Sequence, residues 1–137
     1  FGQYLYEKFR DALEASQSRA IPLAEAERQV IGCTHADVGS LLAKRWNMAP
    51  EVIATLQFHH VPLQAPEKFK KYAIIAHVAD FMVRKRLIGA GGGHDPQLER
   101  AAWDALHLSK RSIPDVLSEI DNLMSQQDLA GSDSVLN

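Results

Sequence analysis

The stretch YAIIAHVADFMV, residues 72–83, decides the fold class of this chain. His77 and Asp80 are its only polar residues, so apolar side chains cover nearly the whole circumference of a helix built from it. Such a helix is typical of the middle of a bundle, where other helices cover it on several sides. Because runs of β-branched residues that would indicate strands are also missing, the sequence predicts an all-α fold.

Helical spacing and capping signals around this stretch predict a helical bundle of about six or seven helices. The expected helices run from Leu5 to about Gln17, from Pro22 to Val30, from Thr34 to Asn47, from Pro50 to a stop at Val61-Pro62, through 72–83 to the glycines at 89–93, from Asp95-Pro96 past Trp103, and from Ser112 onward. We expect one domain over residues 1–128 and a disordered tail over 129–137.

The third of these helices carries the clearest local signals. Thr34 is an N-cap residue, and Asp37 stands three residues later, where a capping box places its acid. The apolar stripe of this helix is predicted to consist of Val38, Leu42 and Trp46. His35 shares that face and is expected to point inward, and Gly39 is expected to let a neighbouring helix approach closely.

Composition excludes several function classes. A formal net charge of −2 argues against a nucleic-acid surface, which needs concentrated Lys and Arg. No apolar run approaches the roughly 20 residues that span a bilayer, and no signal peptide is evident. Cys33 is the only cysteine, so no disulfide framework is possible and a cytoplasmic location is expected.

Four polar residues stand where core residues are expected. His35, His59 and His60 lie on or beside predicted apolar stripes, and Asp80 lies in the most apolar helix. Three imidazoles and a carboxylate could converge on a zinc, iron or manganese ion. The alternative is structural: the histidine pair would cap a helix end, and Asp80 would accept a hydrogen bond from His77.

Other chemistry has weaker support. The glycines at 89–93 follow no strand and precede no Lys-Ser/Thr pair, so they do not indicate a phosphate loop. Cys33 is interpreted as an unreactive thiol at the edge of the core. Glu25, Glu27 and Arg28 are interpreted as a solvated face, although Glu27 could also cap a helix or pair inward.

Three motifs carry a resemblance to a known family. ERQVIGCTHADVG (27–39), LAKRWN (42–47) and HHVP (59–62) resemble the HDOD domain, the output-domain branch of the HD superfamily and a relative of the HD-GYP phosphodiesterases. The similarity extends over about 25–83 and includes Ala79-Asp80. The resemblance implies an HD-superfamily-like helical fold.

In the HD superfamily, a His-Asp doublet, further histidines and a final Asp bind one or more metal ions. The resemblance maps the later ligands onto His35, His59, His60 and Asp80. No His-Asp doublet occurs in the 137 residues, so we expect it upstream of Phe1, and the chain resembles the C-terminal portion of the domain. The Gly-Tyr-Pro element of the phosphodiesterases is also missing after His60.

The resemblance implies a non-catalytic regulatory module of bacterial signal transduction, with no required cofactor. Its expected partners are signalling proteins or fused output domains. The alternative is a metal-dependent phosphohydrolase that uses iron, manganese or zinc, with the remaining ligands upstream. A third possibility is an interaction surface, formed by the last amphipathic helix and the glycine loop at 89–93, for homodimerisation or for docking a fused output domain.

Overall fold

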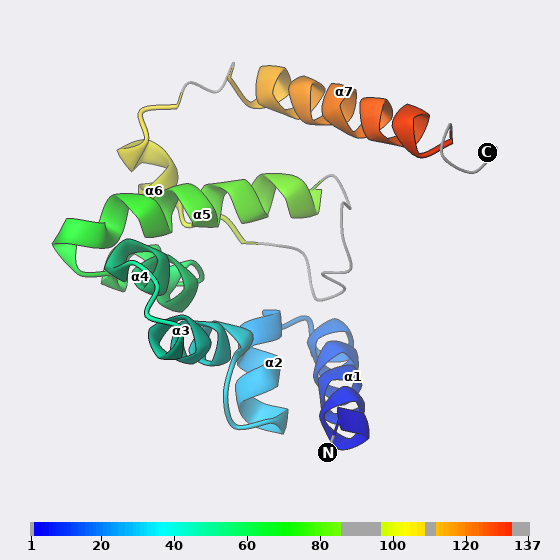
Figure 1. Cartoon of the computed structure of the whole chain (residues 1–137), viewed down its shortest axis with the longest axis vertical. Helices are drawn as coiled ribbons and strands as arrows, with labels where there is room; N and C mark the ends of the chain where they lie inside the picture. The colour runs from blue at the N-terminus through cyan, green and yellow to red at the C-terminus, as the bar shows by residue number, and fades with distance from the viewer. Residues whose placement is uncertain (1, 86–96, 109–111, 133–137) are drawn as a thin grey trace. The chain divides into compact units, whose positions relative to one another are not determined.

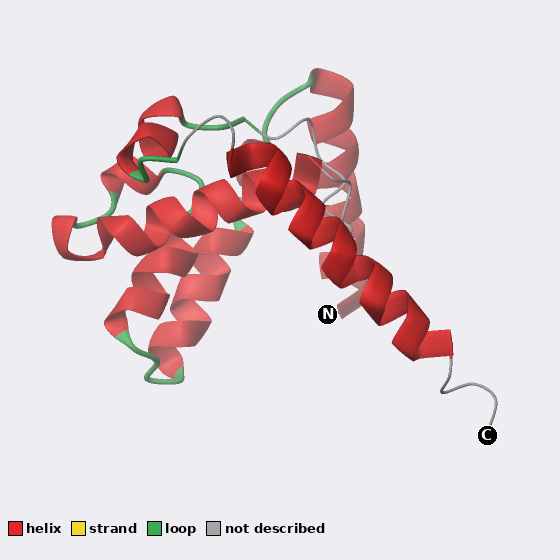
Figure 2. Ribbon diagram, turned by 90° about the horizontal axis from the view of Figure 1, so that it is seen from above, coloured by secondary structure: helices red, strands yellow, loops and turns green. Residues whose placement is uncertain are grey.

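The computed structural model of the chain describes residues 2–85, 97–108 and 112–132. Within these ranges it contains seven α-helices and one 3-10 helix but no strand, which confirms the predicted all-α fold (Figures 1 and 2). The elements are α1 (Gly2–Arg19), α2 (Leu23–Val30), α3 (His35–Arg45), α4 (Pro50–Phe58), η1 (Pro62–Gln64), α5 (Glu67–Lys85), α6 (Arg100–Ala105) and α7 (Ser112–Ser132). No described helix combines the length and the apolarity needed to cross a membrane.

The chain divides into two compact units, Phe1–Leu106 and His107–Asn137. In the first unit the helices pack in sequence: α1 against α2, α2 against α3, α3 against α4, α4 against α5, and α5 against α6. Most buried apolar residues of this unit are alanines, including Ala12, Ala26, Ala43, Ala54, Ala73 and Ala102. Small side chains allow the helix axes to approach closely. The second unit contains α7, which begins at Ser112 as predicted.

Local capping signals correctly predicted where α3 and α4 begin. The Thr34 hydroxyl accepts a hydrogen bond from the backbone N–H of Asp37 at 3.1 Å, and Asp37 Oδ2 accepts one from the Thr34 N–H at 2.9 Å. This is the predicted capping box. Pro50 occupies the first turn of α4, and Gly32 ends the turn after α2 with a φ of +90°.

The predicted core face of α3 was wrong. The helix buries Ala36, Ser40 and Ala43. The larger side chains of the predicted stripe are exposed: Val38 at 45%, Leu42 at 42% and Trp46 at 70%. The physical reason is close packing, because a row of small residues brings the backbone of α3 nearer to its neighbours than large side chains would. Gly39 lies beside this row, where an added Cβ would stand 3.9 Å from Leu56 Cδ2 of α4.

Helix α5 is also less enclosed than its sequence predicts. One side is buried by α4, η1 and α6 through Ala73, Ile74, His77, Val78 and Met82. The opposite side exposes half of Tyr72 and 46% of Ile75. Apolar residues therefore lie on all sides of α5, although the described helices bury only part of its surface.

Several predictions fall on residues outside the described ranges. These are the glycine loop at 89–93, the cap at Asp95-Pro96 and the last residues of the tail, 133–137. The helix expected after that cap is described from Arg100 onward, and its Trp103 is buried. The domain boundary at residue 128 stays a prediction.

Candidate metal centre

Three histidines from the α3–α4 pair converge on one point. His35 is the first residue of α3, while His59 caps the C-terminus of α4 and His60 follows it. Nε2 of His35 lies 3.3 Å from Nε2 of His59 and 2.7 Å from Nε2 of His60. One ligand nitrogen from each residue lies within 4.8 Å of the other two. The packing of α3 on α4, which places the start of one beside the end of the other, therefore creates a group of three possible metal ligands.

Hydrogen bonds at the opposite ring nitrogens orient two of these imidazoles. Nδ1–H of His35 donates to Glu27 Oε2 at 2.7 Å, and Nδ1–H of His59 donates to the Leu56 carbonyl at 2.9 Å. The Leu56 carbonyl can only accept, and Glu27 Oε2 already accepts from the His35 backbone N–H, so Nδ1 is the donor in each pair. The Nε2 of a neutral ring then presents a lone pair toward the cluster. His60 donates from Nε2 to His35 Nε2, because His35 has already committed its proton to Glu27.

Burial favours the neutral form of two histidines of this cluster, His59 and His60. It lowers the pKa of His59, against the opposing effect of the hydrogen bond to the Leu56 carbonyl. Burial, reinforced by the neighbouring His59 and His35, lowers the pKa of His60 to about 3. A neutral imidazole is the form that binds metal ions.

Glu27 is a site residue that the sequence interpretation placed mainly on a solvated face. In the structure it is only 1% exposed, so the inward-pairing alternative was correct. Its Oε2 accepts two hydrogen bonds from His35, one from the backbone N–H at 3.0 Å and one from ring Nδ1 at 2.7 Å. No local signal predicts this contact, because it depends on how α2 packs against α3.

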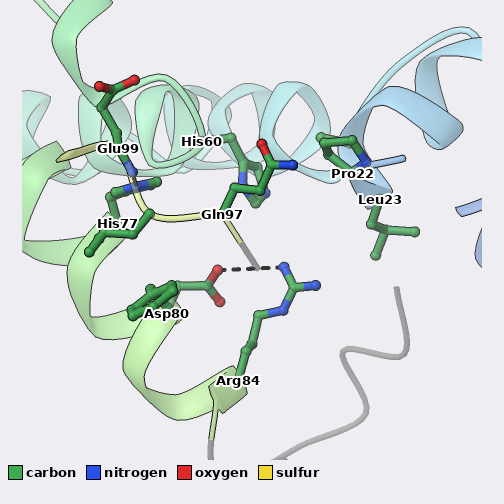
Figure 3. A pocket seen from close by; sticks show the side chains of 11 residues that line it. Pro22, Leu23, His60, His77, Asp80, Arg84, Gln97 and Glu99 are labelled. Atoms are coloured by element: carbon green, nitrogen blue, oxygen red, sulfur yellow. Dashed lines mark hydrogen bonds and ion pairs between the residues drawn. The ribbon is translucent and has the colours of Figure 1, made fainter. Parts of the chain in front are cut away.

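Asp80, the fourth expected ligand, borders the cluster rather than joining the three-histidine group. Among the described residues, only His35, His59 and His60 form that group. Asp80 Oδ2 lies 3.7 Å from Nη1 of Arg84, one turn later on α5, and its side chain is 42% exposed (Figure 3). Its charge still reaches His59, whose pKa it raises slightly against the larger lowering by burial.

His77 serves the backbone instead of donating to Asp80. Its Nδ1–H donates to the His59 carbonyl at 2.8 Å, and its Nε2 accepts from the backbone N–H of Glu99 at 2.9 Å. Both ring nitrogens are thus committed, which ties the end of α4 to α5 and to the segment that enters α6 (Figure 3). The sequence analysis missed this bridge because both partners are backbone groups distant in sequence.

The three histidines lie in a part of the chain that matches a known protein family. Residues 1–62 match the HDOD domain family. The predicted resemblance is thereby confirmed for this part of the chain, and the match includes Glu27 and all three clustered histidines. It begins earlier than the expected 25–83 and ends before Asp80.

One curated relative matches about half of the chain. An uncharacterized protein of Treponema pallidum (strain Nichols) is 34% identical over 71 residues, which cover 52% of this chain. The matched part is 14% of the length of that protein, so this chain corresponds to a small portion of it. No solved structure matches the chain.

A cavity of about 210 Å³ adjoins the histidine cluster. His60 connects the two, and Asp80 and Arg84 line the cavity from α5 (Figure 3). Leu23 at the start of α2 and Gln97 before α6 also line it (Figure 3). The cavity therefore brings one possible metal ligand next to an ion pair.

Proposed function

We propose that this chain is a non-catalytic regulatory module of bacterial signal transduction, acting in the cytoplasm through contacts with signalling proteins or fused output domains. The HDOD match over residues 1–62 supports this role, which the resemblance implies. The exposed stripe of Val38, Leu42 and Trp46 supports protein contacts, because these residues follow one another at helical spacing and a contiguous exposed apolar patch often marks an interaction surface.

The observation that carries the non-catalytic part is the composition of the cluster. Among the described residues it offers three imidazoles, while the Asp80 carboxylate faces Arg84. Phosphodiester hydrolysis by metal ions commonly uses ligands that hold two ions and clamp the attacking and leaving oxygens. Three imidazole nitrogens suit one ion better than two.

We propose that the cluster binds a single divalent metal ion, with zinc as the best fit and iron as the next. The donor set fits, because imidazole nitrogens are ordinary ligands of both ions and the hydrogen bonds of His35 and His59 fix their rings. His35, His59 and His60 would hold the ion. A bound ion would supply Lewis acidity and would fasten the start of α3 to the end of α4.

A hydrolysis assay tests the non-catalytic proposal. The full chain, supplied in turn with zinc, manganese and iron, is mixed with bis(p-nitrophenyl) phosphate and with a cyclic dinucleotide. We expect turnover no greater than that of a His35→Ala variant. Turnover that the His35→Ala substitution abolishes would contradict the proposal.

A second candidate, a metal-dependent phosphohydrolase, is favoured by the cavity beside His60. Arg84 lines this cavity, and a guanidinium can form paired hydrogen bonds with a phosphate. The same assay separates the candidates. A phosphohydrolase would lose turnover on the Arg84→Ala substitution while keeping its metal content, whereas a regulatory module has no turnover to lose.

A further inference from the structure

We propose that Glu27 is a positioning residue for the metal centre: its buried carboxylate holds the His35 ring in the tautomer that presents Nε2 to the ion. This inference rests on the proposed metal site. It concerns a residue outside the predicted ligand set, one that is hydrogen-bonded to the cluster through His35.

The burial of Glu27 requires a specific partner. Its side chain is 1% exposed, and a carboxylate in such a place is costly unless it is paired and hydrogen-bonded. The Nδ1–H of His35 at 2.7 Å is the partner side chain. Water cannot take the place of His35, because the carboxylate is almost completely enclosed. The hydrogen bond to His35 is therefore part of the fold.

The geometry locks His35 at two points. One carboxylate oxygen accepts from both the backbone N–H and the ring of the same residue, at 3.0 Å and 2.7 Å. The first bond fixes where α3 begins, and the second fixes the rotation and the tautomer of the ring. With Nδ1 protonated, only Nε2 can bind an ion, and it faces His59 and His60.

The hydrogen-bond acceptors of His35 and His59 differ in charge. His59 donates from Nδ1 to the neutral carbonyl of Leu56, whereas His35 donates to an acid. A carboxylate hydrogen-bonded behind a metal-binding imidazole makes the ring a stronger ligand and contributes negative charge near the ion. His35 should therefore be the ligand that contributes most to affinity, and Glu27 should be the cause.

The test compares Glu27→Gln with Asp37→Asn in the full chain. Both substitutions keep side-chain size and remove one negative charge near the start of α3. Only Glu27→Gln changes the acceptor of the His35 ring, because Asp37 bonds to Thr34. Zinc affinity is measured by calorimetry, and histidine ring tautomers are measured by long-range proton–nitrogen NMR on the metal-free protein, with His35→Ala to assign the signal.

For Glu27→Gln we expect zinc affinity to fall roughly 10- to 100-fold, as for other partners of metal-bound histidines. We expect the His35 signal to change from the Nδ1–H form to a mixture, because the amide NH₂ can donate to a bare Nδ1. Asp37→Asn should leave both readouts unchanged. If Glu27→Gln does not fold, Glu27→Asp keeps the charge with a shorter reach and should show an intermediate loss of affinity.

Different results would overturn separate parts of the account. An unchanged His35 tautomer in Glu27→Gln would refute the role of Glu27, and so would a zinc affinity within twofold of the wild type. Failure of the wild-type chain to bind zinc would refute the proposed metal site. The tautomer measurement needs no metal, so it decides the role of Glu27 in either case.

Discussion

At the residue scale, His77 shows how a histidine beside the three-histidine cluster can be purely structural. It is 8% exposed, and both ring nitrogens bond to backbone groups of other segments. The His77→Phe substitution keeps an aromatic ring at this position but removes both ring nitrogens. The His59 carbonyl and the Glu99 N–H then lose this partner. We expect the free energy of unfolding to fall by about 2 kcal/mol or more.

Urea denaturation of wild type and variant measures this loss. His107→Asn is the matched control, because His107 is exposed and asparagine tolerates its positive φ of 54°. The control should change stability by less than about 0.5 kcal/mol. Equal unfolding midpoints for His77→Phe and wild type would show that the bridge contributes nothing.

Asp37, the acid of the capping box, leads to a prediction about how the stability of the fold depends on pH. Hydrogen bonds from the backbone and the hydroxyl of Thr34 lower the pKa of Asp37 below the ordinary value for an aspartate. A lowered folded-state pKa stabilises the fold above the unfolded pKa, and this stabilisation disappears as the pH falls through the folded pKa. Because Asp37 is largely exposed, the effect should stay below about 1 kcal/mol.

The measurement is the difference in unfolding free energy between wild type and Asp37→Asn across pH 2–7. Wild type should be the more stable above about pH 5, and the difference should shrink steadily below pH 4. A difference that stays constant over this range would contradict the proposed role of the ionised carboxylate.

Single residues also show the limit of sequence reasoning about the site. The resemblance correctly singled out three histidines that meet, because motif order carries that information. For Glu27 the sequence could not decide between a solvated face and inward pairing, since the contact with His35 depends on the angle between α2 and α3. Arg84 as the partner of Asp80 was missed as well, although the two stand one helical turn apart.

At the element scale, two glycines should respond in opposite ways to alanine. Gly32 has a φ of +90° with nothing within 4 Å of an added Cβ, so Gly32→Ala is strained by its backbone alone. We expect a loss of about 1–2 kcal/mol. Gly39 is inside α3, and its new Cβ would make an ordinary contact at 3.9 Å. Gly39→Ala should add about 0.5–1 kcal/mol through helix propensity.

Thermal or urea unfolding of the two variants provides the check. Because each serves as the control for the other, a general intolerance to substitution cannot explain opposite signs. Destabilisation by Gly39→Ala would mean that α3 and α4 pack more tightly there than the 3.9 Å separation indicates.

The two tryptophans test which face of α3 is buried. Trp46 is 70% exposed and Trp103 is 8% exposed. The Trp103→Phe variant, which keeps Trp46, should emit at long wavelength and be quenched readily by iodide. The Trp46→Phe variant should emit at shorter wavelength and resist quenching. Matching spectra from the two variants would contradict the assigned faces.

Element boundaries and element faces differed in how well they could be predicted. The capping box at Thr34 and the proline at Pro50 are local signals, and both predicted a helix start correctly. The buried face of α3 depends on which neighbour packs against it. Periodicity favoured the large side chains of Val38, Leu42 and Trp46, whereas the structure packs α3 through its small residues.

At the scale of the whole molecule, the first unit connects successive helices through the cluster and its supporting bonds. Glu27 of α2 holds His35 of α3, which meets His59 and His60 after α4. His77 of α5 then holds the backbone of His59. A metal ion at the three histidines would thus stabilise a connected part of the unit, and its binding should raise the unfolding temperature.

The central claim is that His35, His59 and His60 form one metal site, and a metal titration tests it most directly. The full chain, freed of metal, is titrated with cobalt(II) while the visible absorption is recorded, and zinc is then added to displace the cobalt. We predict saturation at one cobalt per chain, displacement by zinc, and loss of stoichiometric binding in His35→Ala and His60→Ala. No cobalt signal from the wild-type chain, or equal binding by the variants, would contradict the account.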